Sequence, residues 1–180
     1  MIRSLLHRTI RGFERRYDYD ATYMHEILEA SLPAFIKLLL AQAMNAHREA
    51  VPLDALFAAR VAAVRFEDCG PCAQLVVNMA REAGLASTTL RAIVARDTAL
   101  LSDDARLGLA LADAVLAHTP CDEVRDEIRR RWGEAGLVTL AYTIAGTRTY
   151  PTMKRALGHA HTCERLTVDG ESVPAARAAA

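Results

Sequence analysis

Residues 67–83 read Glu-Asp-Cys-Gly-Pro-Cys-Ala-Gln-Leu-Val-Val-Asn-Met-Ala-Arg-Glu-Ala, a pair of cysteines three positions apart followed by a mostly apolar run. Pro71 suits the first turn of a helix, because an N–H at that position would have no intrahelical partner. Gly84 follows the run and is a good C-terminal stop. The stretch therefore predicts a helix that starts near Cys69, carries Cys72 about one turn inside and ends before Gly84.

The remainder of the chain also has helical patterns. Hydrophobic residues make up 52% of the 180 residues and aromatic residues only 6%, a mixture that builds closely packed helices rather than sheets. Apolar spacing and turn residues predict helices over 20–47 with a division at Pro33, from Pro52 to about Arg65, from Ser87, from Ser102 to about His118, over 122–131 and 134–147, and through His159 and His161. We expect an all-α single domain of about eight helices over residues 1–170, without a strand, and a poorly ordered tail at 171–180.

Charge and hydropathy argue against several classes of partner. Lys and Arg number 22, as do Asp and Glu, so the chain has no net field that would recruit nucleic acid. No apolar run reaches the roughly 18 residues that cross a bilayer. No GxGxxG or P-loop pattern occurs. We therefore expect no nucleic-acid partner, no membrane partner and no cofactor.

The N-terminal segment bears on location. Residues 1–16 are basic and mildly amphipathic, but they lack the apolar stretch and cleavage site of a signal peptide. They predict a helix that docks on the rest of the protein, with a helix on a membrane surface as the alternative. We expect a cytoplasmic protein. We also expect a homo-oligomer, since the Ala- and Leu-rich helices offer more apolar surface than one subunit hides.

The cysteines suggest thiol chemistry. The chain has four: Cys69, Cys72, Cys121 and Cys163. In a reducing compartment a Cys-x-x-Cys pair is redox-active or metal-binding more often than part of a disulfide framework. The helix dipole and the free N–H groups at a helix start favour a thiolate. The adjacent Glu67 and Asp68 oppose it, because nearby carboxylates raise a thiol's pKa, although either could accept a proton.

Two stretches resemble a known family. ARVAAVRFEDCGPCAQLVVNMAREAGL (59–85) and RWGEAGLVTLAYTIAGTRTYPTMKRALG (131–158) resemble the core helices of the AhpD-like, or carboxymuconolactone decarboxylase, superfamily. The resemblance covers residues 53–160 and lies nearest the alkylhydroperoxidase-like branch, which keeps the cysteine pair. It implies an AhpD-like helical fold and a homo-oligomer.

The resemblance also implies a mechanism. The protein would be a thiol-dependent peroxidase or disulfide oxidoreductase that acts on a small-molecule hydroperoxide or disulfide. Cys72 would attack and become a sulfenic acid, Cys69 would resolve it as a disulfide, and an external thiol reductant would reset the pair.

Two positions depart from the family's pattern. The family has a His four residues after the second cysteine and a Glu twelve residues before the first, where this chain has Val76 and Phe57. Glu67, two residues before Cys69, is the candidate to replace the missing proton relay. On this hypothesis Glu67→Gln slows thiol oxidation by at least about tenfold.

Histidines near the C-terminus offer further possibilities. His159 or His161 could be a base for Cys72, or His159 and Cys163 could complete a zinc site with the cysteine pair. They could also be surface histidines near a helix end. Three rival functions remain. The missing His and Glu of the family's pattern favour a non-catalytic protein with a degenerate relay, the possible metal ligands favour a zinc-stabilised domain, and the decarboxylase branch of the family suggests a cofactorless lyase or isomerase.

Overall fold

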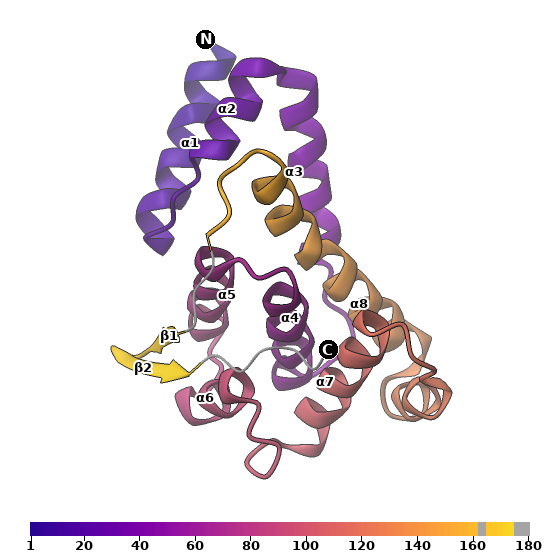
Figure 1. The fold of residues 1–180 in the computed structure, drawn as a ribbon. Helices are drawn as coiled ribbons and strands as arrows, with labels where there is room; N and C mark the ends of the chain where they lie inside the picture. Colours follow the sequence, from indigo (N-terminus) through magenta and orange to yellow (C-terminus); the bar gives the residue numbers. More distant parts are fainter. Residues whose placement is uncertain (162–164, 175–180) are drawn as a thin grey trace.

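The computed structural model describes residues 1–161 and 165–174, and within these residues it contains eight helices and one hairpin (Figure 1). The elements are α1 (Ile2–Tyr17), α2 (Thr22–Ala30), α3 (Leu32–Ala46), α4 (Leu53–Phe66), α5 (Gly70–Glu82), α6 (Ser87–Ala95), α7 (Asp103–Leu116), α8 (Asp122–Ala156), β1 (Arg165–Val168) and β2 (Glu171–Pro174). The expected all-α class with about eight helices is confirmed.

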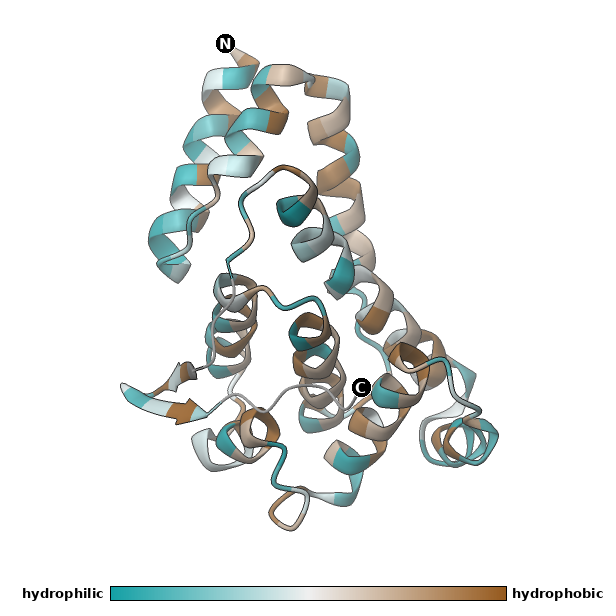
Figure 2. Ribbon diagram, in the orientation of Figure 1, coloured by the Kyte–Doolittle hydropathy of each residue, from teal (hydrophilic) through white to brown (hydrophobic). Residues whose placement is uncertain are grey.

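Helix α4 forms the centre of the larger core. Nine of its 14 residues are buried, so it is covered on nearly every side, by α7 and α8 above all and also by α5 and α6. Gly108 of α7 permits the closest approach, because a Cβ at that position would lie 2.2 Å from the carbonyl oxygen of Ala55. Figure 2 shows the apolar character of α4 and the hydrophilic first part of α8.

Helices α1–α3 form a second cluster above this core (Figure 1). Its largest buried side chains include Tyr23, Leu28 and Phe35. Leu75 of α5 and Tyr150 of α8 pack against the same cluster. The N-terminal helices therefore dock on the start of α5 and the end of α8.

Local signals set most helix ends. Ser31 accepts a hydrogen bond from the Ala34 N–H (3.2 Å) with Pro33 in the first turn, which confirms the division of segment 20–47. Ser102 caps α7 by accepting from the Ala105 N–H (3.0 Å). Gly84 follows α5 with a φ of 89°, the left-handed conformation that glycine adopts readily.

Helix α8 differs from expectation in its second half. The two helices expected over 122–131 and 134–147 follow each other directly within α8. They are separated only by a kink at Gly133, whose backbone angles are not helical (φ 67°, ψ −173°). The helix then continues through Pro151 to Ala156. The expected final helix through His159 and His161 is wrong: Gly158 takes a φ of 81°, and residues 159–161 are outside any helix.

The expectation of no strand is also wrong. β1 and β2 pair antiparallel around Asp169-Gly170, with Leu166 opposite Val173. Both turn residues have positive φ (52° and 79°), as a two-residue hairpin turn requires, and Asp-Gly is a common sequence for it. The expected tail is therefore a strand over Glu171–Pro174, and residues 175–180 lie outside the described part of the chain.

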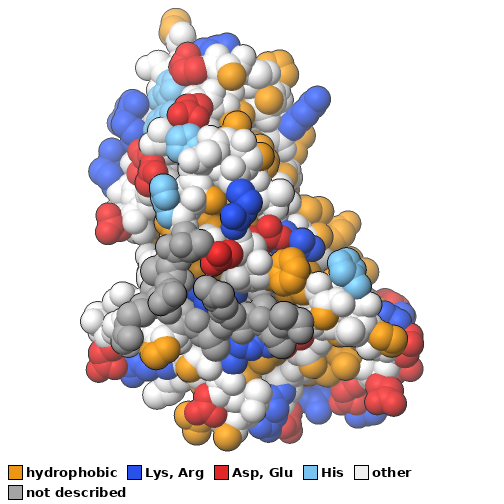
Figure 3. Space-filling view, viewed as in Figure 1, with side chains coloured by type: hydrophobic (Ala, Val, Ile, Leu, Met, Phe, Trp, Pro, Cys, Tyr) orange, Lys and Arg blue, Asp and Glu red, His pale blue; other side chains and the backbone are white. Residues whose placement is uncertain are grey.

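The surface mixes both charges with apolar groups. Figure 3 shows acidic and basic side chains interspersed over the visible face, with apolar side chains along α3 at the upper right. On α3, Ile36 and Leu40 are exposed, as are Val138 and Tyr142 on α8. None of the described helices is both long and apolar enough to cross a membrane.

Candidate functional site

The two cysteines lie where the sequence predicts, at the start of α5. Cys69 is the N-cap residue and Pro71 occupies the first turn. The two sulfurs form a disulfide, with 5.3 Å between the Cα atoms. Cys69 is 1% exposed and Cys72 is 4% exposed, so this is a buried pair rather than a surface bridge.

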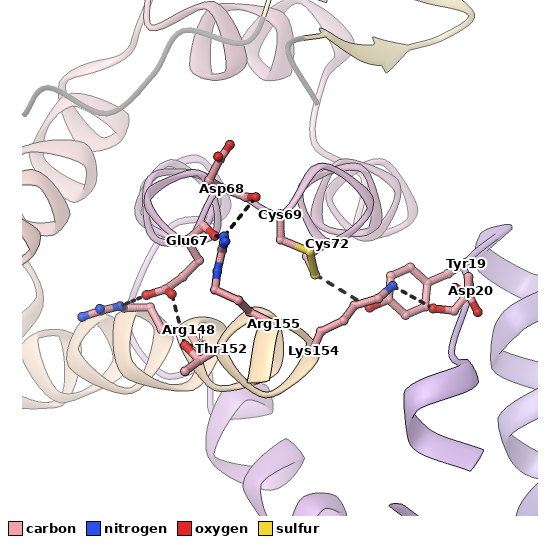
Figure 4. Close-up of a disulfide and its surroundings, with 10 residues drawn as sticks. All are labelled: Tyr19, Asp20, Glu67, Asp68, Cys69, Cys72, Arg148, Thr152, Lys154 and Arg155. Atoms are coloured by element: carbon pink, nitrogen blue, oxygen red, sulfur yellow. Dashed lines mark hydrogen bonds and ion pairs between the residues drawn. A yellow bond between two sulfur atoms is a disulfide. The ribbon is translucent and has the colours of Figure 1, made fainter. Parts of the chain in front are cut away.

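Two distant segments hold the turn before α5. The Gly70 N–H donates to the carbonyl of His161 at 2.8 Å, so one of the free helix N–H groups is used by the chain itself. The Arg155 guanidinium, from α8, donates to the carbonyls of Glu67 and Asp68 (Figure 4). A fixed positive charge therefore lies beside the backbone that leads into Cys69.

The Glu67 side chain points to α8 (Figure 4). One carboxylate oxygen accepts from Arg148 Nε at 2.5 Å, and the other accepts from the Thr152 hydroxyl at 3.1 Å. Both partners belong to α8. The carboxylate thus anchors the turn on α8, and its use as a base for the cysteines stays a prediction.

The two histidines proposed as bases have different surroundings. His159 Nε2 lies 2.8 Å from a carboxylate oxygen of Glu26 in α2. The side chain of His161 is exposed, and this residue reaches the site through its backbone carbonyl. Neither histidine lies in a helix.

The zinc site proposed from sequence has no counterpart in the described residues. No group of three or more His, Cys, Asp or Glu side chains in residues 1–161 and 165–174 is arranged to hold a metal ion. Cys163 lies outside these ranges.

The polar group nearest to the Cys72 sulfur is a tyrosine that the sequence analysis did not identify. The Tyr19 hydroxyl, from the link between α1 and α2, lies 3.8 Å from Cys72 Sγ (Figure 4). Lys154 Nζ lies 4.5 Å from the centre of the Tyr19 ring and donates to the carbonyl of Asp20 at 3.0 Å. Lys154 is 1% exposed, so its charge acts where little water screens it.

Burial changes the acidity of these groups. It raises the pKa of Tyr19 to about 12, because a buried phenolate loses its hydration. It lowers the pKa of Lys154 for the same reason, although Asp20 opposes the shift. Tyr19 is therefore a neutral hydroxyl at physiological pH, able to donate a hydrogen bond to a sulfur or an oxygen.

A cavity of about 230 Å³ lies between the N-terminal helices, α4, α5 and α8. Cys72 and Val76 form part of its wall, so one of the two positions that depart from the family's pattern is an apolar wall residue. Tyr150 also lines the cavity, and its hydroxyl is buried without a hydrogen-bond partner. The cavity thus joins the sulfur of Cys72 to an otherwise mostly apolar interior space.

Comparison of the chain with protein-family models, with curated proteins and with solved structures gives no match. The AhpD-like resemblance therefore stays a prediction.

Sequence reasoning missed Tyr19, Lys154 and Arg155 as site residues. Tyr19 contacts Cys72 across 53 residues of sequence, and it lies outside the stretch that carries the resemblance. An Asp-Gly turn between alternating apolar residues could have revealed the hairpin. No comparable local signal marks Tyr19, because its role arises from the packing of α1–α3 on α5.

Proposed function

We propose that the protein is a thiol-dependent peroxidase or disulfide oxidoreductase in which Cys72 is the attacking sulfur and Cys69 the resolving one. The observation that carries the proposal is the placement of Cys72 on the wall of an apolar cavity, with a disulfide partner and a neutral hydroxyl beside it. Cys69, in contrast, does not line the cavity. A substrate in the cavity would meet Cys72 first.

The reaction consumes a hydroperoxide. The Cys72 thiolate attacks the terminal oxygen, the O–O bond breaks, and a proton goes to the departing alkoxide, leaving an alcohol and a sulfenic acid. The Cys69 thiol then attacks the Cys72 sulfur, water leaves, and the disulfide forms. A dithiol reductant returns the pair to thiols and becomes a disulfide itself.

Tyr19 and Lys154 supply the polar groups for this chemistry. The Tyr19 hydroxyl can donate to the Cys72 thiolate or to the departing oxygen. Lys154 lies over the Tyr19 ring, and its positive charge makes the hydroxyl a better donor. Tyr19 would thereby take part of the role that the relay histidine has in the family that the chain resembles.

Burial of both sulfurs also restricts the reductant. Cys69 and Cys72 are almost without exposed surface, so a folded protein cannot reach the disulfide in this conformation. A small dithiol that enters through the cavity fits better. In the cytoplasm, the compartment that the sequence predicts, such a reductant keeps the pair reduced between turnovers.

Glu67 acts in this proposal as a positioning residue. Its ion pair with Arg148 and its hydrogen bond with Thr152 fix the turn before Cys69. Glu67→Gln should then slow thiol oxidation by only a few fold, whereas loss of a general base would slow it by at least about tenfold. The single-turnover oxidation rate and its pH profile distinguish the two roles.

Thiol mapping tests the function directly. The reduced protein would receive one equivalent of an organic hydroperoxide, followed by an acid quench, alkylation and mass spectrometry. We expect a rapid Cys69–Cys72 disulfide, with Cys121 and Cys163 alkylated. Cys72→Ser should abolish the reaction, and Cys69→Ser should stop at a sulfenic acid on Cys72.

A different result would remove the proposal. If all four thiols remain free while a small-molecule thiol under the same conditions is oxidised, the pair is not a peroxidase centre. A disulfide that forms no faster than in the urea-unfolded chain would indicate a structural bridge, the non-catalytic alternative.

A further inference from the structure

Arg60 of α4 is a cation on the wall of the cavity. One terminal nitrogen donates to the carbonyl of Asn45 at 2.8 Å, and the guanidinium carbon lies 5.2 Å from the centre of the Phe57 ring. Its Nε is buried and has no hydrogen-bond partner. The edge formed by Nε and a terminal nitrogen is the edge with which an arginine holds a carboxylate through two parallel hydrogen bonds.

No ion pair within residues 1–161 and 165–174 balances the charge of Arg60. Among the residues that the structure describes, no carboxylate forms an ion pair with Arg60. Burial lowers its pKa to about 10, and the nearby charge of Arg48 adds to the shift. Arg60 is half-buried, and a guanidinium that loses part of its hydration without a compensating anion is costly. Arg60 would therefore favour the binding of an anionic ligand in the cavity.

Most of the remaining cavity wall is apolar, although Gln42, Asn45 and the tyrosines also line it. The apolar part consists of Leu, Ile, Phe, Met and Val side chains from α1 to α5. Arg60 lies about 9 Å along the axis of α4 from Phe66, the last residue of that helix, after which the chain turns to Cys69. The cationic and sulfur-bearing parts of the wall are thus separated along the helix, with apolar side chains such as Val64 between them.

We propose that the cavity binds an apolar monocarboxylic acid, with its carboxylate on Arg60 and its chain directed toward Cys72. The volume of about 230 Å³ holds on the order of eight water-sized atoms, which matches a medium-length chain. A single guanidinium balances one negative charge, so a carboxylate fits better than a phosphate dianion.

This inference rests on the proposed function only for the identity of the substrate. If Cys72 reduces hydroperoxides, the preferred substrate is a carboxylic acid that carries the hydroperoxide group away from its carboxylate. The buried Tyr150 hydroxyl, without a partner in the structure, would donate to that group. Binding of the acid itself requires no redox step.

The experiment measures binding to the disulfide form of the full chain by calorimetry, with octanoate and 1-octanol as probes. We expect octanoate to bind at least about tenfold more tightly than 1-octanol, because only octanoate pairs with the charge of Arg60. Arg60→Met should remove this preference and leave the affinity for 1-octanol in place. Lys37→Met, which removes an exposed charge from α3 outside the cavity wall, should keep the preference.

The outcomes separate this inference from the function. Equal affinities of the wild-type protein for the two probes, or no binding of either, would overturn the inference whether or not Arg60→Met folds. Preserved octanoate preference in Arg60→Met would also overturn it. Selective octanoate binding by a protein without peroxidase activity would support the site and contradict only the redox function.

Discussion

Replacing Tyr19 with Phe removes a single hydroxyl and keeps the ring. The ring retains its edge contact with Phe13 (centroids 5.8 Å apart) and its contact with Lys154. The hydroxyl lies 3.8 Å from Cys72 Sγ. The substitution therefore tests whether this hydroxyl stabilises the Cys72 thiolate in the reduced protein, with little change in packing.

The expected magnitude follows from this contact. A hydrogen bond to a charged group contributes about 1.5–3 kcal/mol, and one pKa unit corresponds to about 1.4 kcal/mol. Tyr19→Phe should therefore raise the pKa of the Cys72 thiol by about one to two units. A higher thiol pKa lowers the fraction of thiolate at neutral pH, but a more basic thiolate is a better nucleophile, which offsets almost half of this loss in rate. Oxidation at neutral pH should therefore slow about 3- to 10-fold.

Two assays on the reduced protein measure these changes. The pH dependence of Cys72 alkylation, followed by mass spectrometry, gives the thiol pKa, and stopped-flow oxidation by an organic hydroperoxide gives the rate. Tyr142→Phe is the matched control, because this tyrosine is 42% exposed on α8. An unchanged Cys72 pKa in Tyr19→Phe would refute the assigned role of the hydroxyl.

Two further predictions concern stability. Gly108→Ala should destabilise the fold by about 1–3 kcal/mol in urea unfolding, because the added Cβ would meet the Ala55 carbonyl oxygen. Gly12→Ala is the control and should be neutral or stabilising, since its Cβ meets nothing within 4 Å. Equal effects of the two substitutions would contradict the close packing of α7 on α4. Burial raises the pKa of Tyr19 from an ordinary 10 to about 12, so the neutral hydroxyl should contribute about 3 kcal/mol to the free energy of unfolding. This contribution is fully present below pH 10 and is lost as the pH rises through 12. Unfolding at several pH values should show a shallower loss of stability in Tyr19→Phe than in the wild-type protein, and identical slopes would contradict the burial of this hydroxyl.

Most helices could be predicted because their signals are local. Pro33, Ser102 and Gly84 act through backbone geometry or through hydrogen bonds to residues a few positions away. The same reasoning failed after Ala156, where an expected helix is replaced by a loop and a hairpin. Its turn, Asp169-Gly170, carried a local signal that pointed to a hairpin.

The hairpin is also stabilised by a contact that only the fold creates. The side-chain amide of Gln74 exchanges two hydrogen bonds with the backbone of Thr167, at 2.9 and 2.8 Å. Gln74 thereby completes the open edge of β1. Its partner is 93 residues away, so no sequence window contains both.

The candidate site divides in the same way. The spacing of Cys69 and Cys72, with Pro71 between them, determined by itself that two sulfurs meet at a helix start, because three positions at the first turn bring the Cα atoms within disulfide range. Only the tertiary structure decided what surrounds them. Tyr19 and Arg60 reach the cavity because the α1–α3 cluster packs on α4, α5 and α8. Whether a residue is helical depends mainly on its neighbours in sequence. Whether its side chain is buried, and which charges lie near it, depends on chain segments far away in sequence.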